Sequence, residues 1–116
     1  MAIPVAVFDD VLAARGEVFH IPGLDVTVYG HADDVLYVAS SDLPPAVLFM
    51  DYAMGRDHVN GADAIRAVRK AGYRGRIVAM SSDPAANDAM RKAGADESLP
   101  QKAMLRSYLV ALGKSV

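Results

Sequence analysis

Residues 46–51 read Ala-Val-Leu-Phe-Met-Asp, five apolar residues without interruption followed by a single carboxylate. Because polar residues do not alternate with apolar ones, both faces of this segment are predicted to be buried, as in a central strand of a parallel sheet. Pro44 and Pro45 precede the segment and mark its start. Asp51 then lies at the carboxyl end of the predicted strand, the edge at which open α/β sheets bind ligands.

The composition indicates one globular domain over residues 1–116, of which 53% are hydrophobic. The formal net charge is −2 and no basic block is present, which argues against a direct nucleic-acid partner. The chain has no cysteine, no signal peptide and no run of about 18 apolar residues. We therefore expect a cytoplasmic protein that does not contact a membrane.

Short apolar or alternating segments predict four further strands, at residues 3–8, 25–29, 76–80 and 98–99. Helical periodicity with Gly, Pro and Asn boundaries predicts five helices, at residues 11–19, 32–39, 61–71, 84–93 and 102–112. Strands and helices alternate along the chain, and this alternation predicts a parallel sheet with helices on both faces.

Some of these helices carry more specific expectations. The first is indicated by Val11, Leu12, Arg15, Val18 and Phe19, although Gly16 weakens that helix by about 1 kcal/mol relative to alanine. The second would place Leu36 inward. The third is expected to expose a solvated basic face, formed by Arg66, Arg69, Lys70 and Arg74. The three histidines have no metal-ligand spacing and are interpreted as surface residues: His20, His31 and His58.

Polar residues follow the carboxyl ends of the predicted strands. Asp9 and Asp10 follow the first strand, and Asp51 ends the third. Ser81 follows the fourth strand and residues 100–102 follow the last. Parallel strands share one carboxyl edge, so these side chains should converge. Clustered carboxylates raise one another's pKa unless a cation neutralises them, and oxygen donors at a partly open edge suit Mg²⁺.

A carboxylate beside Mg²⁺ can act as a nucleophile toward a phosphoryl group and form an aspartyl phosphate. A purely structural interpretation of each residue is also available. Asp9 and Asp10 would serve as a helix N-cap, and Asp51 would be a solvated loop acid. Ser81 begins Ser-Ser-Asp-Pro, which is also an ordinary helix-start signal.

Several short motifs, taken in order, resemble those of response-regulator receiver domains, and in particular the single-domain chemotaxis regulators. The motifs are Phe8-Asp9-Asp10, Leu48-Phe49-Met50-Asp51 followed by Met54, Asn60-Gly61, Met80-Ser81-Ser82 and Ala93-Gly94-Ala95-Asp96. They are spaced over nearly the whole chain, so the resemblance implies a single receiver domain over residues 1–116. It implies a flavodoxin-like, doubly wound, five-stranded parallel sheet with strand order 2-1-3-4-5 and helices on both faces.

The resemblance also implies roles at the carboxyl edge. Asp51 would accept a phosphoryl group from a sensor histidine kinase or a phosphotransfer protein. Asp10, Asp51 and the main-chain carbonyl of Ala53 would hold Mg²⁺. Asp9 would help through a water molecule, and Ser81 would be the switch hydroxyl. No other cofactor is expected.

Three features depart from the family pattern. Met54 is followed by Gly55 where the family usually has proline, and the loop over residues 55–60 is about two residues longer than usual. Ser98 stands at the position of the family's aromatic switch residue. These departures bear on the output mechanism more than on the fold.

The family's lysine also has no direct counterpart. Alignment from Ala93-Gly94-Ala95 places Gln101 at its position, with Lys102 next. In an extended strand end, Gln101 and Lys102 would point in opposite directions, so Lys102 would face away from Asp51. A one-residue bulge after Pro100 would instead turn Lys102 inward. We favour Lys102 as the residue that reaches Asp51, with Gln101 as the alternative.

The leading functional interpretation is a phosphorylatable signalling receiver that acts as a switch and not as an enzyme. Its output would be a contact with a downstream effector protein, or a homodimer, through the last strand and helices. One alternative, suggested by Ser98 and Gln101, is a receiver-like interaction module that is not phosphorylated. A Mg²⁺-dependent phosphatase is less consistent with the sequence. Such enzymes carry a second aspartate two residues after the nucleophile, where this chain has Val11 or Leu12.

Overall fold

The computed structural model describes residues 2–116. It contains one five-stranded sheet, in the order β2-β1-β3-β4-β5, in which every pairing is parallel. The strands are β1 Ile3–Phe8, β2 Leu24–Tyr29, β3 Val47–Asp51, β4 Arg76–Met80 and β5 Glu97–Leu99. The helices are α1 Asp10–Ala14, α2 Val35–Ala39, α3 Gly61–Lys70, α4 Pro84–Ala93 and α5 Leu105–Lys114, with a 3-10 turn, η1 Lys102–Met104, before α5.

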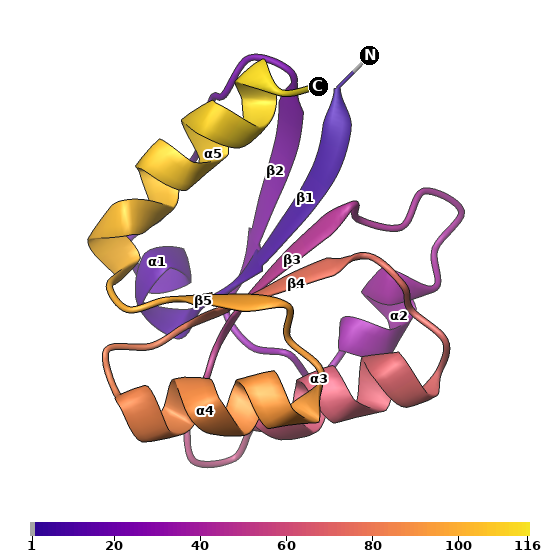
Figure 1. The fold of residues 1–116 in the computed structure, drawn as a ribbon, viewed down its shortest axis with the longest axis vertical. Helices are drawn as coiled ribbons and strands as arrows, with labels where there is room; N and C mark the ends of the chain where they lie inside the picture. The colour runs from indigo at the N-terminus through magenta and orange to yellow at the C-terminus, as the bar shows by residue number, and fades with distance from the viewer. Residues whose placement is uncertain (1) are drawn as a thin grey trace.

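Helices cover both faces of the sheet, with α1 and α5 on one face and α2, α3 and α4 on the other (Figure 1). This arrangement confirms the flavodoxin-like fold and the strand order that the resemblance implied. None of the helices in the described part of the chain is long and apolar enough to cross a membrane.

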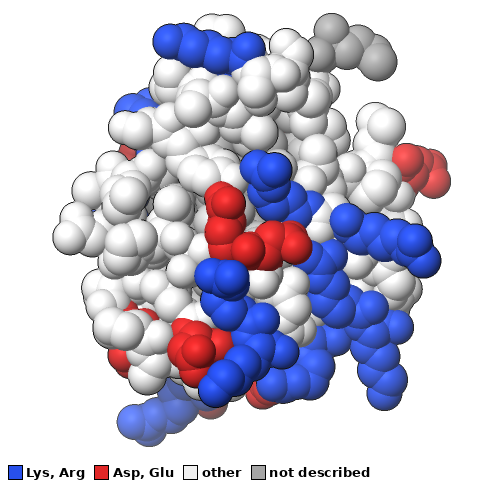
Figure 2. Space-filling model, viewed as in Figure 1, with Lys and Arg blue, Asp and Glu red and all other residues white. Residues whose placement is uncertain are grey.

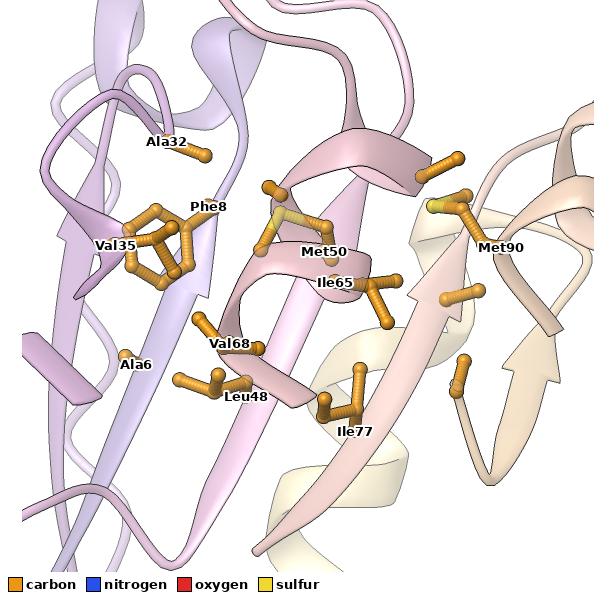
Figure 3. Packing of buried hydrophobic residues seen from close by; sticks show 14 of the residues in the cluster. Ala6, Phe8, Ala32, Val35, Leu48, Met50, Ile65, Val68, Ile77 and Met90 are labelled. Atoms are coloured by element: carbon orange, nitrogen blue, oxygen red, sulfur yellow. The ribbon is translucent and has the colours of Figure 1, made fainter. Parts of the chain in front are cut away.

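The central strand β3 is buried along its whole length, as its uninterrupted apolar run predicted. Its side chains alternate between two cores. Leu48 and Met50 pack beneath Ile65 and Val68 of α3, as Figure 3 shows. Phe49 points to the opposite core, which α1 and α5 cover. Asp51 follows this alternation, so its side chain lies on the side of the sheet that carries α1 and α5.

The first helix is much shorter than expected, and the prediction of a helix over residues 11–19 is wrong. The helix α1 ends at Ala14, and Gly16 adopts a φ of +67°. This left-handed conformation stops a helix and is readily adopted only by glycine. Val18 is consequently 59% exposed, whereas Phe19 is buried in the core beneath α5. The connection to β2 thus closes this core in place of a longer helix.

The second helix also starts later than expected, and the inward placement of Leu36 is wrong. The helix α2 begins at Val35, which is buried, whereas Leu36 is 47% exposed. The preceding residues form a turn in which Asp33 contacts the loop before α3. Its Oδ1 accepts a hydrogen bond from the main-chain nitrogen of Val59, at 3.1 Å.

Arg69 does not belong to a solvated face, in contrast to the sequence-based expectation. Its guanidinium donates to the carbonyl oxygens of Gly94, Tyr73 and Gly75, at 2.8–3.0 Å. It also pairs with Asp96 at 2.9 Å, and thereby connects the end of α3 to the start of β5. Other basic side chains remain exposed at the ends of α3 and α4, where they complement the helix dipoles, and Figure 2 shows them gathered on this side.

The start of α3 is pressed against the end of β3. Asn60 caps the helix by accepting a hydrogen bond from the main-chain nitrogen of Asp63 at 2.9 Å. The main-chain nitrogen of Gly61 donates to the carbonyl of Tyr52 at 2.7 Å. A Cβ at Gly61 would collide with the carbonyl oxygen of Asp51 and would lie 2.8 Å from the sulfur of Met90. Position 61 therefore requires glycine, because β3 and α4 approach its Cα too closely to leave room for a Cβ atom.

We predict that Gly61→Ala lowers the free energy of unfolding by about 1–3 kcal/mol, because the added methyl group overpacks this contact. Gly30→Ala is the matched control, since its Cβ would meet only the Cβ of Ala13, at 3.4 Å. It should change the free energy by less than about 1 kcal/mol. Chemical denaturation measures both values, and equal losses in the two variants would contradict the proposed collision.

Candidate functional site

Strand pairing brings two carboxylates side by side. In the β1–β3 ladder Phe8 is paired with Met50, so the next residues, Asp9 and Asp51, are neighbours at the carboxyl edge. Both continue the alternation of their strands toward the α1 and α5 side. Asp9 is completely buried, and Asp51 is 7% exposed. The predicted convergence of these two acids is confirmed.

Each of these carboxylates is oriented by one main-chain hydrogen bond. Oδ1 of Asp9 accepts from the nitrogen of Leu12 at 3.0 Å and caps α1, so the structural interpretation of Asp9 as an N-cap is also correct. Oδ1 of Asp51 accepts from the nitrogen of Tyr52 at 2.8 Å. The second oxygen, Oδ2, of each acid is left for another partner.

That partner is Lys102. Its Nζ lies 2.9 Å from Oδ2 of Asp9 and 3.2 Å from Oδ2 of Asp51, whereas Gln101 is exposed. The bulge that we invoked for this orientation is not its cause, because β5 pairs with β4 in continuous register and ends at Leu99. Lys102 instead opens the 3-10 turn η1. Strand alternation no longer applies there, and the side chain turns back over the edge of the sheet.

Asp10 completes the acidic cluster. It is the first residue of α1 and is half-buried, and oxygens of Asp9, Asp10 and Asp51 all lie within 4.8 Å of one another. Ala53 lies in the loop directly after Asp51, two residues beyond the end of β3. The predicted carboxylates are thus brought together.

The charges in this cluster are not balanced by the lysine. Burial, and then the nearby charge of Asp9, raise the pKa of Asp51 above its usual value, and Lys102 offsets this only in part. Burial by itself would lower the pKa of the Lys102 amine, but its pairing with the two acids raises the pKa overall. The cluster therefore holds three carboxylates, of which only Asp9 and Asp51 pair with the ammonium group of Lys102.

One buried oxygen also lacks a hydrogen bond. Among the described residues, Oδ2 of Asp9 is close enough to Lys102 for an ion pair but accepts no hydrogen bond with good geometry. An under-neutralised set of oxygen donors, in which Oδ2 of Asp9 has an ion-pair partner but no hydrogen bond, fits a hard divalent cation such as Mg²⁺, which binds through one or two carboxylates and retains several waters.

Ser81 lies at the same edge, but its hydroxyl is engaged locally. The Oγ of Ser81 accepts from the main-chain nitrogen of Asp83 at 3.1 Å. Asp83 in turn caps α4 through the nitrogen of Ala85. This is the helix-start arrangement that the Ser-Ser-Asp-Pro segment also allowed. Within residues 2–116 the hydroxyl of Ser81 has no hydrogen bond to Asp51 or Lys102.

Ser98 lies on β5 and is half-buried. Together with Ser81 it lines a surface hollow between β4, α4 and β5, to which Asn87, Arg91 and Pro100 also contribute. The serine side chain is too small to fill this hollow. An aromatic switch residue is therefore not available at this position.

Sequence reasoning missed one group of residues. His31 and His58, interpreted as dispersed surface residues, stack against each other with ring centroids 4.4 Å apart, and Asp33 lies beside both. The rule that residues after the carboxyl ends of parallel strands converge, which grouped the acids, could also have grouped these histidines. Both of them lie in loops that follow such strand ends. His20 is exposed and separate.

Comparison with known proteins supports the fold. No family model matches the sequence, and no curated protein matches it either. Among solved structures, a CheY-like response-regulator receiver domain protein from Methanospirillum hungatei has a TM-score of 0.74 at 14% identity, over 99% of this chain and 93% of that one.

Two further solved structures are similar over almost the whole chain. The BeF3-activated DrrB receiver domain has a TM-score of 0.70 at 18% identity, over 99% of this chain and 97% of that one. The phosphorylated cyanobacterial phytochrome response regulator RcpA has a TM-score of 0.66 at 12% identity, over 99% and 91%. At such low identities the likeness establishes the architecture: the chain has the fold of response-regulator receiver domains.

We predict that Asp51→Asn raises the free energy of unfolding of the metal-free protein at neutral pH by about 0.5–2 kcal/mol. The amide keeps the hydrogen bond from Tyr52 and removes the charge that burial and Asp9 disfavour. Because the folded-state pKa of Asp51 is raised, the wild type loses stability as the pH rises from the ordinary value of 3.8 through that raised pKa. The advantage of the variant should therefore vanish below pH 3.8.

Denaturant unfolding in the presence of a chelator, at neutral and acidic pH, measures this difference. The exposed Asp42→Asn is the control and should stay within about 0.5 kcal/mol of the wild type at both pH values. If Asp51→Asn is less stable than the wild type at neutral pH, the ionised carboxylate of Asp51 stabilises the folded wild-type protein, and the prediction is wrong.

Lys102→Ala should lower the free energy of unfolding by about 1–3 kcal/mol, because the buried Asp9 would lose its cation. The pKa of Lys102 is raised above 10.5, so this contribution is present throughout neutral pH and is lost only in more alkaline solution. Gln101→Ala is the matched control and should change the stability by less than about 0.5 kcal/mol. The same unfolding measurement compares them, and a larger loss in Gln101→Ala would contradict the assignment of the lysine.

Proposed function

We propose that this protein is a phospho-accepting signalling receiver of a two-component system, in which Asp51 takes the phosphoryl group. One observation carries the proposal: Asp51 ends the central strand of a receiver-type fold beside Asp9, with a single lysine amine in contact with both. Two of the similar solved structures are a BeF3-activated and a phosphorylated receiver. The phosphorylated state of the second of these proteins supports the idea that this fold can carry a phosphoryl group.

The reaction that we propose is the transfer of a phosphoryl group from a phosphohistidine to the carboxylate of Asp51. An oxygen of Asp51 forms the new O–P bond, the P–N bond to the donor imidazole breaks, and the imidazole takes up a proton. The donor would be a sensor histidine kinase or a phosphotransfer protein. The added negative charge would arise beside the amine of Lys102, which is positioned to pair with a phosphoryl oxygen.

Asp10, Asp51 and the main-chain carbonyl of Ala53 would hold Mg²⁺, with Asp9 acting through a water molecule. When bound, the ion would neutralise the carboxylates and the oxygens of the incoming phosphoryl group. The oxygen-only donors, the raised pKa of Asp51 and the unsatisfied Oδ2 of Asp9 support this assignment.

The protein would act as a cytoplasmic switch, without turnover of a diffusible substrate and with residues 1–116 as one receiver domain. Ser81 would exchange its local hydrogen bond with Asp83 for one to the phosphoryl group. The output would be a contact with an effector protein, or with a second copy, through β5 and α5. Met104 and Val110, which are exposed apolar residues on η1 and α5, support this choice of surface.

A receiver-like interaction module that is not phosphorylated is the second candidate. It is favoured by the hydroxyl of Ser81, which is already used at the start of α4, and by Ser98, which cannot act as an aromatic switch. In that case Lys102 would be a permanent neutralising partner of the two acids.

Incubation with acetyl phosphate and Mg²⁺ should add one phosphoryl group to the wild-type protein, detected by mass and removed by hydroxylamine. We expect no labelling of Asp51→Asn or in the presence of a chelator. Labelling of Asp10→Asn and Lys102→Ala should be at least about tenfold slower, because the charge of the product is less well neutralised. Gln101→Ala is the control and should be labelled like the wild type.

The BeF3-activated DrrB receiver domain provides a parallel reaction. If that protein is labelled and the wild type of this chain is not, the interaction module is the correct reading. If Asp51→Asn is still labelled, the phosphoryl acceptor is another residue.

A further inference from the structure

A second group of metal-ligand side chains lies outside the acidic cluster. His31 and Asp33 belong to the connection between β2 and α2, and His58 belongs to the connection between β3 and α3. The two imidazole rings stack with an interplanar angle of 5°. The Oδ2 of Asp33 lies 2.7 Å from Nδ1 of His58 and 3.7 Å from Nδ1 of His31.

The carboxylate in this group is held in place. Its other oxygen, Oδ1 of Asp33, accepts from the main-chain nitrogen of Val59 at 3.1 Å, so it connects the two loops independently of the histidine rings. The hydrogen bond from His58 holds the pKa of Asp33 below its usual range. The carboxylate is therefore ionised at neutral pH, which is the form that binds a metal ion.

Two imidazoles and one carboxylate are a common ligand set for divalent transition ions with an open coordination position. Ligands about 2.0–2.1 Å from a tetrahedral ion are separated from one another by about 3.3–3.4 Å. The two distances from Oδ2 of Asp33 to the histidine nitrogens bracket this separation. All three side chains are 36–41% exposed, so a water molecule can complete the coordination.

We infer that His31, Asp33 and His58 form a binding site for a zinc-class divalent ion, separate from the acidic cluster. Coordination would replace the hydrogen bond between His58 and Asp33, and His58 would bind the ion through Nδ1 as the neutral imidazole that carries its proton on Nε2. His31 would give up a weak hydrogen bond from the nitrogen of Asp33, at 3.3 Å. The stacked rings would also tilt toward a common point, and their exposure leaves room for this movement.

The nitrogen donors make this site selective against the ion proposed for Asp51. Mg²⁺ prefers oxygen ligands, whereas imidazole suits zinc, copper and nickel. A bound ion would connect the β2–α2 loop to the loop that leaves Asp51, and would restrict the motion of the latter. The inference does not depend on phosphorylation, because it rests only on these three side chains and their loops.

Titration of the full chain with Zn²⁺ in excess Mg²⁺, followed by calorimetry and by NMR of the histidine rings, tests the inference. One equivalent should bind, and the ring signals of His31 and His58 should shift together while those of His20 stay unchanged. His31→Gln and His58→Gln should each weaken binding by at least about tenfold, since even outer-shell partners of metal ligands contribute that much. His20→Gln is the matched control and should bind like the wild type.

Asp51→Asn distinguishes this site from the acidic cluster and should leave the Zn²⁺ affinity unchanged. Loss of Zn²⁺ binding in Asp51→Asn would assign the ion to the acidic cluster and overturn the inference. Equal weakening in all three histidine variants would indicate non-specific surface binding. Absence of binding to the wild type would reduce the group to a hydrogen-bonded contact between two loops.

Discussion

The structure depends on the neutralisation of carboxylates that strand pairing forces together. Asp9 and Asp51 follow paired residues of adjacent parallel strands, and both point into a low-dielectric side of the sheet. Their repulsion is relieved by Lys102, which opens a 3-10 turn and extends back over the sheet edge. The conformation of the β5–α5 connection is therefore coupled to the charge at the end of β3, and an added phosphoryl group or cation would act on the same balance.

The residues of this edge serve the fold and the site at once. Asp9 caps α1 with one oxygen and carries the unsatisfied oxygen of the cluster with the other. The carbonyl of Asp51 packs so closely on Gly61 that the start of α3 is tied to the end of β3. Asp51 therefore contributes its carboxylate to the acidic cluster and its carbonyl to the contact with α3, and burial together with the charge of Asp9 raises the pKa of that carboxylate.

The carboxyl edge also separates two kinds of ligand chemistry. The acids around Asp51 offer only oxygen donors, whereas the loops after β2 and β3 bring imidazoles against Asp33. At another part of this edge, Ser98 and Ser81 line a hollow between β4, α4 and β5. These differences concern the loops and the last strand, while the buried strands retain the common architecture.

The sequence pattern by itself determined the parallel sheet and the acidic cluster, whereas the strand order was implied by the resemblance to receiver domains. An apolar run without alternation predicts a doubly buried strand, and parallel strands share one edge, so Asp9, Asp10 and Asp51 could be brought together before any coordinates were known. Only the tertiary structure decided that Lys102 replaces Gln101 at the acids and that His58 meets His31. The position of Lys102 depends on the turn that redirects the chain after β5, and the contact between His31 and His58 depends on how closely two loops approach each other. Neither can be read from the periodicity of apolar residues within one segment. The early end of α1, before Gly16, was also not predicted from the sequence. The helical pattern there was weak, and the connection that follows α1 packs against the core instead of extending the helix.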